Sequence, residues 1–362
     1  MSKQWIKWHR LLALLALVPL FIMSVTGAIL VFKPELDAWL LSGKATLPAP
    51  AEVGQRQSMT SLMTHIKQQL PAYELGSWEL FDDGVRSDAV YLVHRDSQEW
   101  AKVFLDPYRG VLLSEPVGLS DYLSDWLVDL HYRFLLGPSG TIVGFLASLA
   151  LLFLGISGLK MHRQFYRKLF SLRWRGDWRV RNSSLHRLAG AWAAPVLIIL
   201  AFTGGYWNAE ELLHDLHEVT EPHPPLKGPL YTEAVNFDEL LKRAQVALPG
   251  IRLNFLVFPT EPELDITFYG KLPGVNPLAS NYSASVNFSP QTGELTTKTE
   301  QSSQPWYLTV DDSFRALHFG DFAGMGSRIV WTVLGSMPLI LGISGLYLYL
   351  SRRRKKGLPA SI

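Results

Sequence analysis

Leu-His-Arg at residues 185–187 opens an apolar run, Leu188 to Trp207, that is broken by Thr203-Gly204-Gly205. The chain starts in the same way, because Trp8-His9-Arg10 precedes an apolar run that reaches Phe32 and contains Thr26-Gly27. In both places the glycine that directly follows the threonine lies 18 residues after the histidine. One half of the protein is therefore repeated in the other.

A second element is repeated as well. Leu130-His131 lies 27 residues before the last glycine of Gly155-Ile156-Ser157-Gly158. Leu317-His318 lies 27 residues before the last glycine of Gly342-Ile343-Ser344-Gly345. The order of elements is A, B, A′, B′, and we expect each element to carry one histidine at the entry to an apolar helix.

Composition and hydropathy predict a membrane protein. Hydrophobic residues make up 48% of the chain and charged residues only 18%. Four apolar stretches, at about 11–32, 140–160, 188–207 and 329–350, approach the roughly 20 residues that a spanning helix needs. The fold class we expect is an α-helical membrane protein with four transmembrane helices in two tandem repeats.

The distribution of positive charge predicts the orientation. Residues 160–187 hold nine Lys or Arg and one acid, Asp177, so this segment should be cytoplasmic. A site for an anionic partner is the competing reading of the same charge. Basic residues before the first span and after the fourth place both termini inside. The first apolar run could be a secretory signal, but its cleavage would discard His9.

Cysteine is absent from the sequence. This excludes thiolate metal ligands, iron–sulfur clusters, covalently attached haem and disulfides. Histidine is left as the ligand for any redox cofactor.

The two outer segments show the same pattern of elements, each an α+β module. The first contains an expected helix at Met59–Leu70 and strands at Asp88–Arg95 and Trp100–Leu105. A turn at Asp106–Gly110 then leads into Val111–Leu113. The second contains Phe237–Leu248, Leu253–Phe258, Leu264–Tyr269, Ala284–Phe288, a turn at Ser289–Gly293 and Glu294–Lys298. Residues 33–58 read as a connector, and amphipathic stretches at 119–136 and 307–319 precede the second and fourth spans.

These features predict eight consecutive segments. They are a first transmembrane helix with its cytoplasmic N-terminus (1–33), a first module (34–118), an amphipathic segment with the second helix (119–162), a basic cytoplasmic loop (163–185), a third helix (186–210), a second module (211–306), an amphipathic segment with the fourth helix (307–351) and a basic cytoplasmic tail (352–362).

The four repeated histidines are the candidate cofactor ligands. His9 and His186 occupy matched positions on the inner side, and His131 and His318 do so on the outer side. Two helices that each offer one imidazole at one depth can hold a planar haem between them, so the sequence predicts two haem b groups. Structural repetition without a cofactor and a non-haem metal are the alternatives.

Other polar residues have two readings each. Arg10 and Arg187 could meet haem propionates or lipid phosphates. Asp125 and Asp312, six residues before the outer histidines, either orient partners or are solvated on their helices, which we favour. His162 is a reserve inner ligand. His214, His217 and His223 have a spacing that suits a metal, but a solvated surface is preferred.

The arrangement resembles the PepSY-associated transmembrane helix family of bacterial inner-membrane proteins. The residues that carry the resemblance are Trp8-His9-Arg10, Leu130-His131, Leu185-His186-Arg187, Leu317-His318 and the two Gly-Ile-Ser-Gly segments, and it covers roughly 5–355. It implies PepSY-like modules in the periplasm. Members are often iron-regulated and include bis-haem siderophore reductases. By resemblance, His9, His186, His131 and His318 are haem ligands, with a five-coordinate inner haem or a His162 ligand left open.

The resemblance implies an oxidoreductase, a ferric-siderophore reductase that converts Fe(III) to Fe(II) in the periplasm. Its partners would be a ferric siderophore, a cytoplasmic or quinol electron donor and membrane lipid, with no nucleic acid. Trp126, Trp306 and Tyr307 are candidate substrate contacts or interfacial anchors. A cofactor-free PepSY binding or regulatory protein and a quinone-linked cytochrome b are the alternatives.

Overall fold

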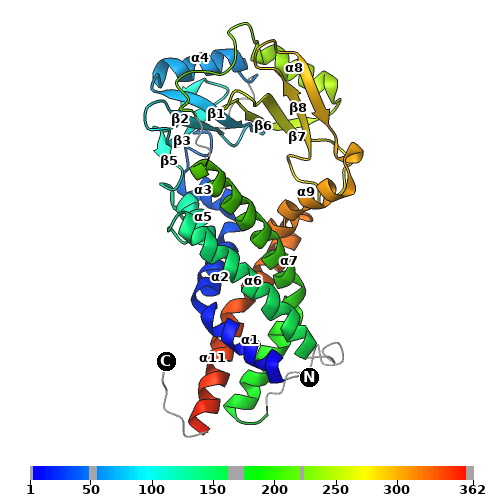
Figure 1. Cartoon of the computed structure of the whole chain (residues 1–362). Coiled ribbons are helices and arrows are strands. Elements are labelled where there is room, and N and C mark those ends of the chain that lie inside the picture. The colour runs from blue at the N-terminus through cyan, green and yellow to red at the C-terminus, as the bar shows by residue number, and fades with distance from the viewer. Residues whose placement is uncertain (1–2, 49–54, 162–174, 221–223, 356–362) are drawn as a thin grey trace. The chain divides into compact units, whose positions relative to one another are not determined.

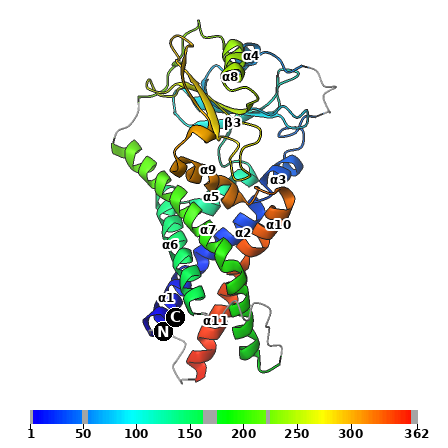
Figure 2. The same ribbon diagram turned by 90° about the vertical axis from the view of Figure 1, so that its right-hand side faces the viewer.

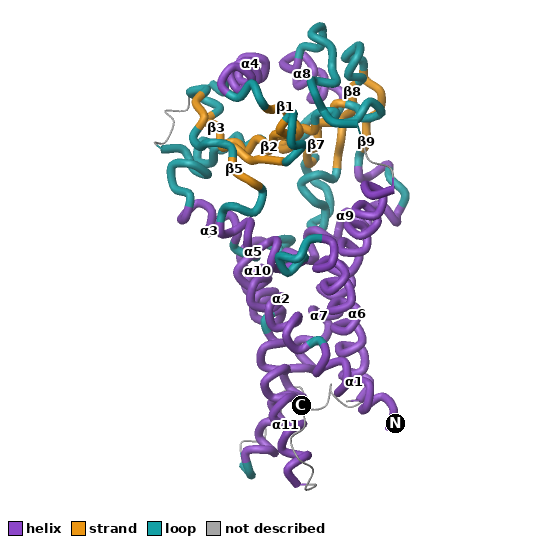
Figure 3. Tube along the Cα trace, turned by 60° about the vertical axis from the view of Figure 1, so that its left-hand side comes forward, coloured by secondary structure: helices purple, strands orange, loops and turns teal. Residues whose placement is uncertain are grey.

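The computed structural model describes residues 3–48, 55–161, 175–220 and 224–355. The chain forms two compact units (Figure 1). The helical unit comprises Met1–Phe32, Trp126–Thr220 and Leu317–Ile362, and the sheet unit comprises Lys33–Asp125 and Glu221–Ala316. Figure 3 shows that the strands all belong to the sheet unit.

The helical unit is built from the apolar runs and their flanking segments. Its helices are α1 (Lys3–Leu15), α2 (Leu17–Leu30), α6 (Pro138–Met161), α7 (Trp178–Thr220), α10 (Gly324–Gly335) and α11 (Met337–Lys355), together with most of α5 (Leu123–Tyr132) and the end of α9 (Trp306–Phe319). Helices α6 and α7 pack along each other, and α11 packs on α7 and α2.

The helices that the structure describes include three apolar spans, or up to four if a bent pair of helices is one span. Three are long and apolar enough to cross a bilayer by themselves: Pro138–Met161, Trp178–Thr220 and Gly324–Arg352. The bent pair is α1 and α2, which meet at an angle of 63°. Pro19 explains this bend, because a proline ring collides with the carbonyl group four residues earlier and has no N–H to donate.

The histidines lie within helices rather than at their entries, which corrects the expectation from the sequence. Helix α7 begins at Trp178, eight residues before His186, and α1 begins at Lys3. Helix α7 also continues past the expected end to Thr220, because no proline or glycine interrupts residues 206–220. His131 and His318 lie near the ends of α5 and α9, which stop before the predicted glycine-containing breaks.

The sheet unit contains one continuous sheet. Its nine strands are β1 (Tyr73–Glu79), β2 (Asp88–His94), β3 (Trp100–Asp106), β4 (Val111–Leu112), β5 (Val117–Gly118), β6 (Arg252–Val257), β7 (Ile266–Lys271), β8 (Ala284–Phe288) and β9 (Leu295–Thr299). The order is β4-β3-β2-β1-β6-β7-β8-β9, with β5 paired to β3. The two expected modules are thus joined edge to edge, which the sequence reading did not anticipate.

The join is an antiparallel pairing of β1 with β6. Ser77 lies opposite Val257, Trp78 opposite Leu256 and Glu79 opposite Phe255. Helices α4 (Met59–Gln69) and α8 (Phe237–Ala247) lie side by side over one face of the sheet (Figure 2). Trp78, Leu256, Phe268 and Leu62 are all fully buried in the single apolar core between these helices and the sheet. This shared core unites both halves of the unit.

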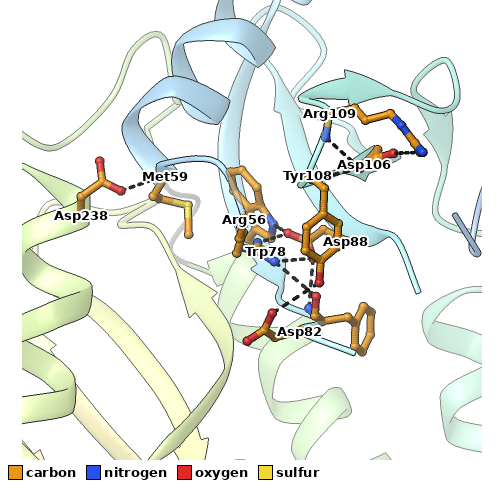
Figure 4. A network of polar contacts seen from close by, with 10 residues as sticks. Arg56, Met59, Trp78, Asp82, Asp88, Asp106, Tyr108, Arg109 and Asp238 are labelled. Carbon is orange, nitrogen blue, oxygen red and sulfur yellow. Dashed lines mark hydrogen bonds and ion pairs between the residues drawn. The ribbon is translucent and has the colours of Figure 1, made fainter. Parts of the chain in front are cut away.

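Two carboxylates bind backbone groups around this core (Figure 4). Asp88 is fully buried and accepts hydrogen bonds from the Trp78 indole at 2.6 Å, the Phe81 amide at 3.0 Å and Arg56 Nη1 at 3.1 Å. Asp238, on α8, accepts from the Met59 amide at 2.6 Å and so caps α4. One half of the unit therefore completes a helix of the other.

The sequence did not predict every element, and helix α3 (Lys33–Leu40) and strand β1 are two of those it missed. Residues 33–58, expected as a connector, begin with helix α3, and β1 precedes the first expected strand. Lys33 and Asp37 form an ion pair at 2.6 Å within α3. Glu74, inside β1, is 2% exposed and is paired with Arg95. Charged residues in both elements hid their structure from a hydropathy pattern.

Candidate functional site

The outer histidines face each other inside the helical unit. The ring centres of His131 on α5 and His318 on α9 are 6.4 Å apart, and the ring planes are inclined by 75°. Two imidazoles on opposite sides of one metal ion, each bonded at about 2 Å, have ring centres about 6 Å apart. The spacing of this pair therefore suits two imidazoles that share one metal ion.

Each outer histidine is held by a threonine from a span of its own half. Thr26 Oγ1 on α2 lies 2.9 Å from His131 Nδ1, and Thr203 Oγ1 on α7 lies 2.8 Å from His318 Nδ1. Each threonine hydroxyl also donates to a carbonyl four residues earlier, that of Ile22 at 2.7 Å or Ile199 at 2.9 Å. Neither threonine had been assigned a role from the sequence.

The inner histidines have the same arrangement with serines. His9 Nδ1 lies 2.6 Å from Ser157 Oγ on α6, and His186 Nδ1 lies 2.9 Å from Ser344 Oγ on α11. Ser344 donates to the Ile340 carbonyl at 2.6 Å, and Ser157 donates to that of Leu154 at 3.2 Å. All four repeated histidines thus share one kind of partner.

The direction of these hydrogen bonds favours one tautomer for every ring. A hydroxyl group has one hydrogen, and in each case that hydrogen is donated to a backbone carbonyl. The hydroxyl oxygen must then accept a hydrogen bond from Nδ1–H of the histidine. Nε2 is left with its lone pair, and this is the nitrogen form that binds a metal.

A glycine beside each hydroxyl allows the ring to approach. A Cβ atom placed on Gly27 would lie 2.9 Å from Cε1 of His131, and one on Gly204 would lie 3.1 Å from Cε1 of His318. The corresponding distances are 3.3 Å for Gly345 and His186, and 3.9 Å for Gly158 and His9. In each Thr-Gly or Ser-Gly pair of the repeat, the hydroxyl group therefore contacts one of the four histidines and the glycine leaves room for its ring.

A cavity of about 490 Å³ lies beside the inner pair. His9 and His186 line it, together with Leu14, Leu154 and other apolar side chains of α1, α2, α6, α7 and α11. Arg10, Arg187 and Arg352 also line it. An apolar cavity of this volume, with two imidazoles and three guanidinium groups, fits a flat apolar cofactor that carries carboxylates.

Burial keeps the outer histidines neutral. It lowers the pKa of His131 to about 4, and burial with the neighbouring His131 lowers the pKa of His318 to about 3. Both rings are therefore uncharged at neutral pH, as metal ligands must be.

The two aspartates before the outer histidines are neither solvated nor bonded to those histidines. Asp125 pairs with Lys102 and, at 2.9 Å, with Lys33 in the sheet unit. Asp312 accepts from the Ser280 amide at 3.0 Å and from the Gln301 side chain at 2.9 Å. The preference for ordinary helix solvation was wrong, because both carboxylates bind other residues of the sheet unit.

The remaining histidines and aromatic residues are outside these pairs. His162 and His223 lie outside the described residues. His214 is 66% exposed and pairs with Glu218 on α7 at 3.8 Å, as expected for a solvated surface. Within residues 3–48, 55–161, 175–220 and 224–355, no three His, Cys, Asp or Glu side chains gather as ligands of one metal ion. The side chains of Trp126, Trp306 and Tyr307 are exposed.

Comparison with known proteins adds a family and a distant relative. The model of the PepSY-associated TM region matches residues 6–352, nearly the whole chain. An uncharacterized protein of Pseudomonas aeruginosa is 25% identical over 260 residues, which are 63% of this chain and 64% of that protein. The chain thus spans just under two thirds of the length of this curated relative.

Proposed function

Because the chain belongs to the family with the PepSY-associated transmembrane region, we propose that it is a b-type dihaem electron-transfer protein of the bacterial inner membrane. It would reduce ferric siderophores on the periplasmic side and so release iron. The observation that supports this best is the set of four histidines, two from each half, each held at Nδ1 by a hydroxyl group so that Nε2 would be the atom that binds iron.

The residues fit haem at both positions. His131 and His318 would hold one haem, and their 6.4 Å ring separation leaves room for one metal ion between the two imidazoles. His9 and His186 would bind the other beside the inner cavity, where Arg10, Arg187 and Arg352 would pair with propionates. Haem supplies one-electron chemistry when bound. A non-haem metal is less favoured, because the described residues form no cluster of three or more ligands.

The spacing of the two pairs suits transfer across a membrane. His186 and Thr203 lie on the same helix, α7, and are separated by 17 positions. Thr203 contacts the outer histidine His318. At 1.5 Å per residue this is about 25 Å, against about 30 Å for the hydrocarbon core of a bilayer. One pair would receive electrons from a cytoplasmic or quinol donor, and the other would pass them to the substrate.

The substrate chemistry needs no catalytic acid or base. One electron converts Fe(III) in the siderophore to Fe(II), which hard oxygen ligands hold less tightly. The role of the polypeptide is to hold the imidazoles, exclude water from the inner cavity with apolar side chains and place the outer pair within reach of a soluble chelate. Apolar surroundings and hydrogen bonds to the ligands tune such centres.

Absorption spectra of the purified protein provide the first test. We expect a Soret band, a sharp α-band on reduction and two haems per chain. His131→Ala or His318→Ala should remove or alter one haem, and His9→Ala or His186→Ala should affect the other. His65→Ala is the control, because His65 contacts Gln69 on the surface of α4. A colourless protein would favour the cofactor-free binding or regulatory alternative.

Reoxidation identifies the substrate class. Protein reduced with dithionite and mixed anaerobically with a ferric hydroxamate siderophore should reoxidise while a ferrous chelator traps Fe(II). His318→Ala should slow this step far more than His65→Ala. If the reduced protein stays reduced with several classes of ferric chelate but is oxidised promptly by a quinone, the protein is a quinone-linked cytochrome instead.

A further inference from the structure

We infer that Thr26, Thr203, Ser157 and Ser344, the hydroxyl seats, are positioning residues that set the reduction potentials of the two haems, each acting on the pair whose histidine it holds. This inference rests on the proposed dihaem function. It assigns a role to the Thr-Gly and Ser-Gly pairs of the repeat that goes beyond helix packing.

The first step is the direction of each hydrogen bond. The seat hydroxyl donates to its own helix and accepts from Nδ1–H, so every ring carries its proton on Nδ1. A hydrogen bond donated from Nδ1–H increases the electron density on Nε2 and makes the imidazole a better ligand for the more highly charged metal. The seats should therefore stabilise Fe(III) relative to Fe(II) and lower the potential.

The second step is the close fit around each ring. The threonine side chains are β-branched and have few rotamers, so a seat threonine holds its oxygen in one place. Gly27 and Gly204 come so near to their histidines that a Cβ atom would lie 2.9 Å and 3.1 Å from the rings. Each outer ring is thus held between the threonine oxygen on one side and the glycine backbone on the other.

The third step is the crossed arrangement of ligands and seats. The apolar run that follows His9 contains Thr26, which holds His131, while Ser157 on α6 holds His9. The second half repeats this with His186, Thr203, His318 and Ser344. Thr26 and Thr203 therefore act on the haem at the opposite end from His9 or His186, the ligand at the start of the same apolar run, which a purely local role would not predict.

The test is a spectroelectrochemical titration of both haems in the full-length protein. Thr26→Val should raise the potential of the haem that His131→Ala removes and leave the other unchanged. Ser157→Ala should raise the potential of the haem that His9→Ala affects and leave the potential of the other haem unchanged. Weakening of the Fe(III) preference by about tenfold, the lower end of the effect of losing a ligand's hydrogen-bond partner, corresponds to a rise of about 59 mV for one electron.

Conservative variants and a matched control separate this role from helix stability. Thr26→Ser and Ser157→Thr keep a hydroxyl and should retain potentials near those of the wild type. Thr332→Val removes a hydroxyl that donates to the Arg328 carbonyl at 2.9 Å in α10, the same backbone bond without a histidine. It should move neither potential. Thr203→Val tests the outer haem from its other ligand if Thr26→Val does not fold.

Three outcomes would overturn the inference. If the protein binds two haems and their reduction potentials are unchanged in every seat variant, the seat role is excluded but the dihaem function is not. A shift of the inner potential by Thr26→Val would exclude the crossed arrangement. A wild-type protein without haem would overturn the proposed function, and the seat inference with it.

Discussion

At the scale of single residues, the repeat in the sequence identified the histidines but not what holds them. The spacing of His9, His131, His186 and His318 from their glycines could be read directly, because both halves carry it. That Thr26 contacts His131 depends on how α2 packs near α5, and no single helix contains this information. The Thr-Gly and Ser-Gly pairs were visible as signatures without an assigned function.

The glycines of the seats offer a graded prediction. Gly27→Ala should displace the His131 ring and reduce haem occupancy at the outer pair, because the new methyl group would lie within 2.9 Å of the ring. Gly158→Ala should be tolerated, since its methyl group would lie 3.9 Å from His9, an ordinary contact. Haem content per chain, measured by pyridine haemochrome spectra, gives the comparison. Equal loss in both variants would contradict the close fit.

The buried Asp88 provides a prediction on stability. Asp88→Ala removes the acceptor of Trp78 and Phe81 and the partner of Arg56, and should destabilise this part of the sheet by about 3–5 kcal/mol. Asp83→Asn, which weakens an exposed pair with Arg86, should cost about 1 kcal/mol or less. Hydrogen exchange of β2 amides in increasing urea measures both. A small effect of Asp88→Ala would show that Arg56 finds another partner.

At the scale of elements, the regular alternation of apolar residues was sufficient for most strands and helices. The prediction for β8, Ala284–Phe288, coincides with the structure, and α4 and α8 end before the prolines that were expected to stop them. Strand β1 was missed because Glu74 is buried by pairing with Arg95, 21 residues away. A charge neutralised by a distant partner cannot be distinguished from a solvated one in a local window.

Helix capping gives a prediction at this scale. Asp238→Ala should weaken the first turn of α4 by about 1 kcal/mol, because Asp238 accepts from the amides of Met59 and Thr60. Asn236→Ala should instead weaken α8, because Asn236 is the N-cap residue of α8. Hydrogen exchange resolved by peptide should show faster exchange in α4 for the first variant and in α8 for the second. Faster exchange in α8 alone for Asp238→Ala would exclude the cap across the halves.

At the scale of the whole molecule, the presence of several apolar spans was predictable but the joining of the two sheets was not. Hydropathy counts spans because each must meet the same length requirement. Pairing of β1 with β6 joins residues far apart in the chain, and either strand could equally have been an edge. The sequence therefore indicated two modules where the structure has one sheet.

Membrane orientation is the prediction that belongs to this scale. Basic residues between the second and third spans should keep that segment cytoplasmic, so an alkaline phosphatase fusion near Gly176 should be inactive and one near Gly274 active. A green fluorescent protein fusion at each position should give the complementary result. The opposite pattern would reverse the assignment of inner and outer histidines.

The pairing of β1 with β6 also bears on ancestry. Trp78 lies opposite Leu256, 178 positions further on, and the same spacing separates Met59 and Phe237, which begin α4 and α8. The Leu80 amide donates to the Asn254 carbonyl and the Phe258 amide to that of Gly76, so equivalent residues exchange equivalent bonds.

Such self-complementarity is the mark of an isologous interface in a two-fold homodimer. Each histidine pair likewise takes one member from each half, so two copies of a single half could have formed both pairs. Fusion of two such genes would have freed the copies to diverge, as Asp125 with its lysines and Asp312 with its serine and glutamine now do.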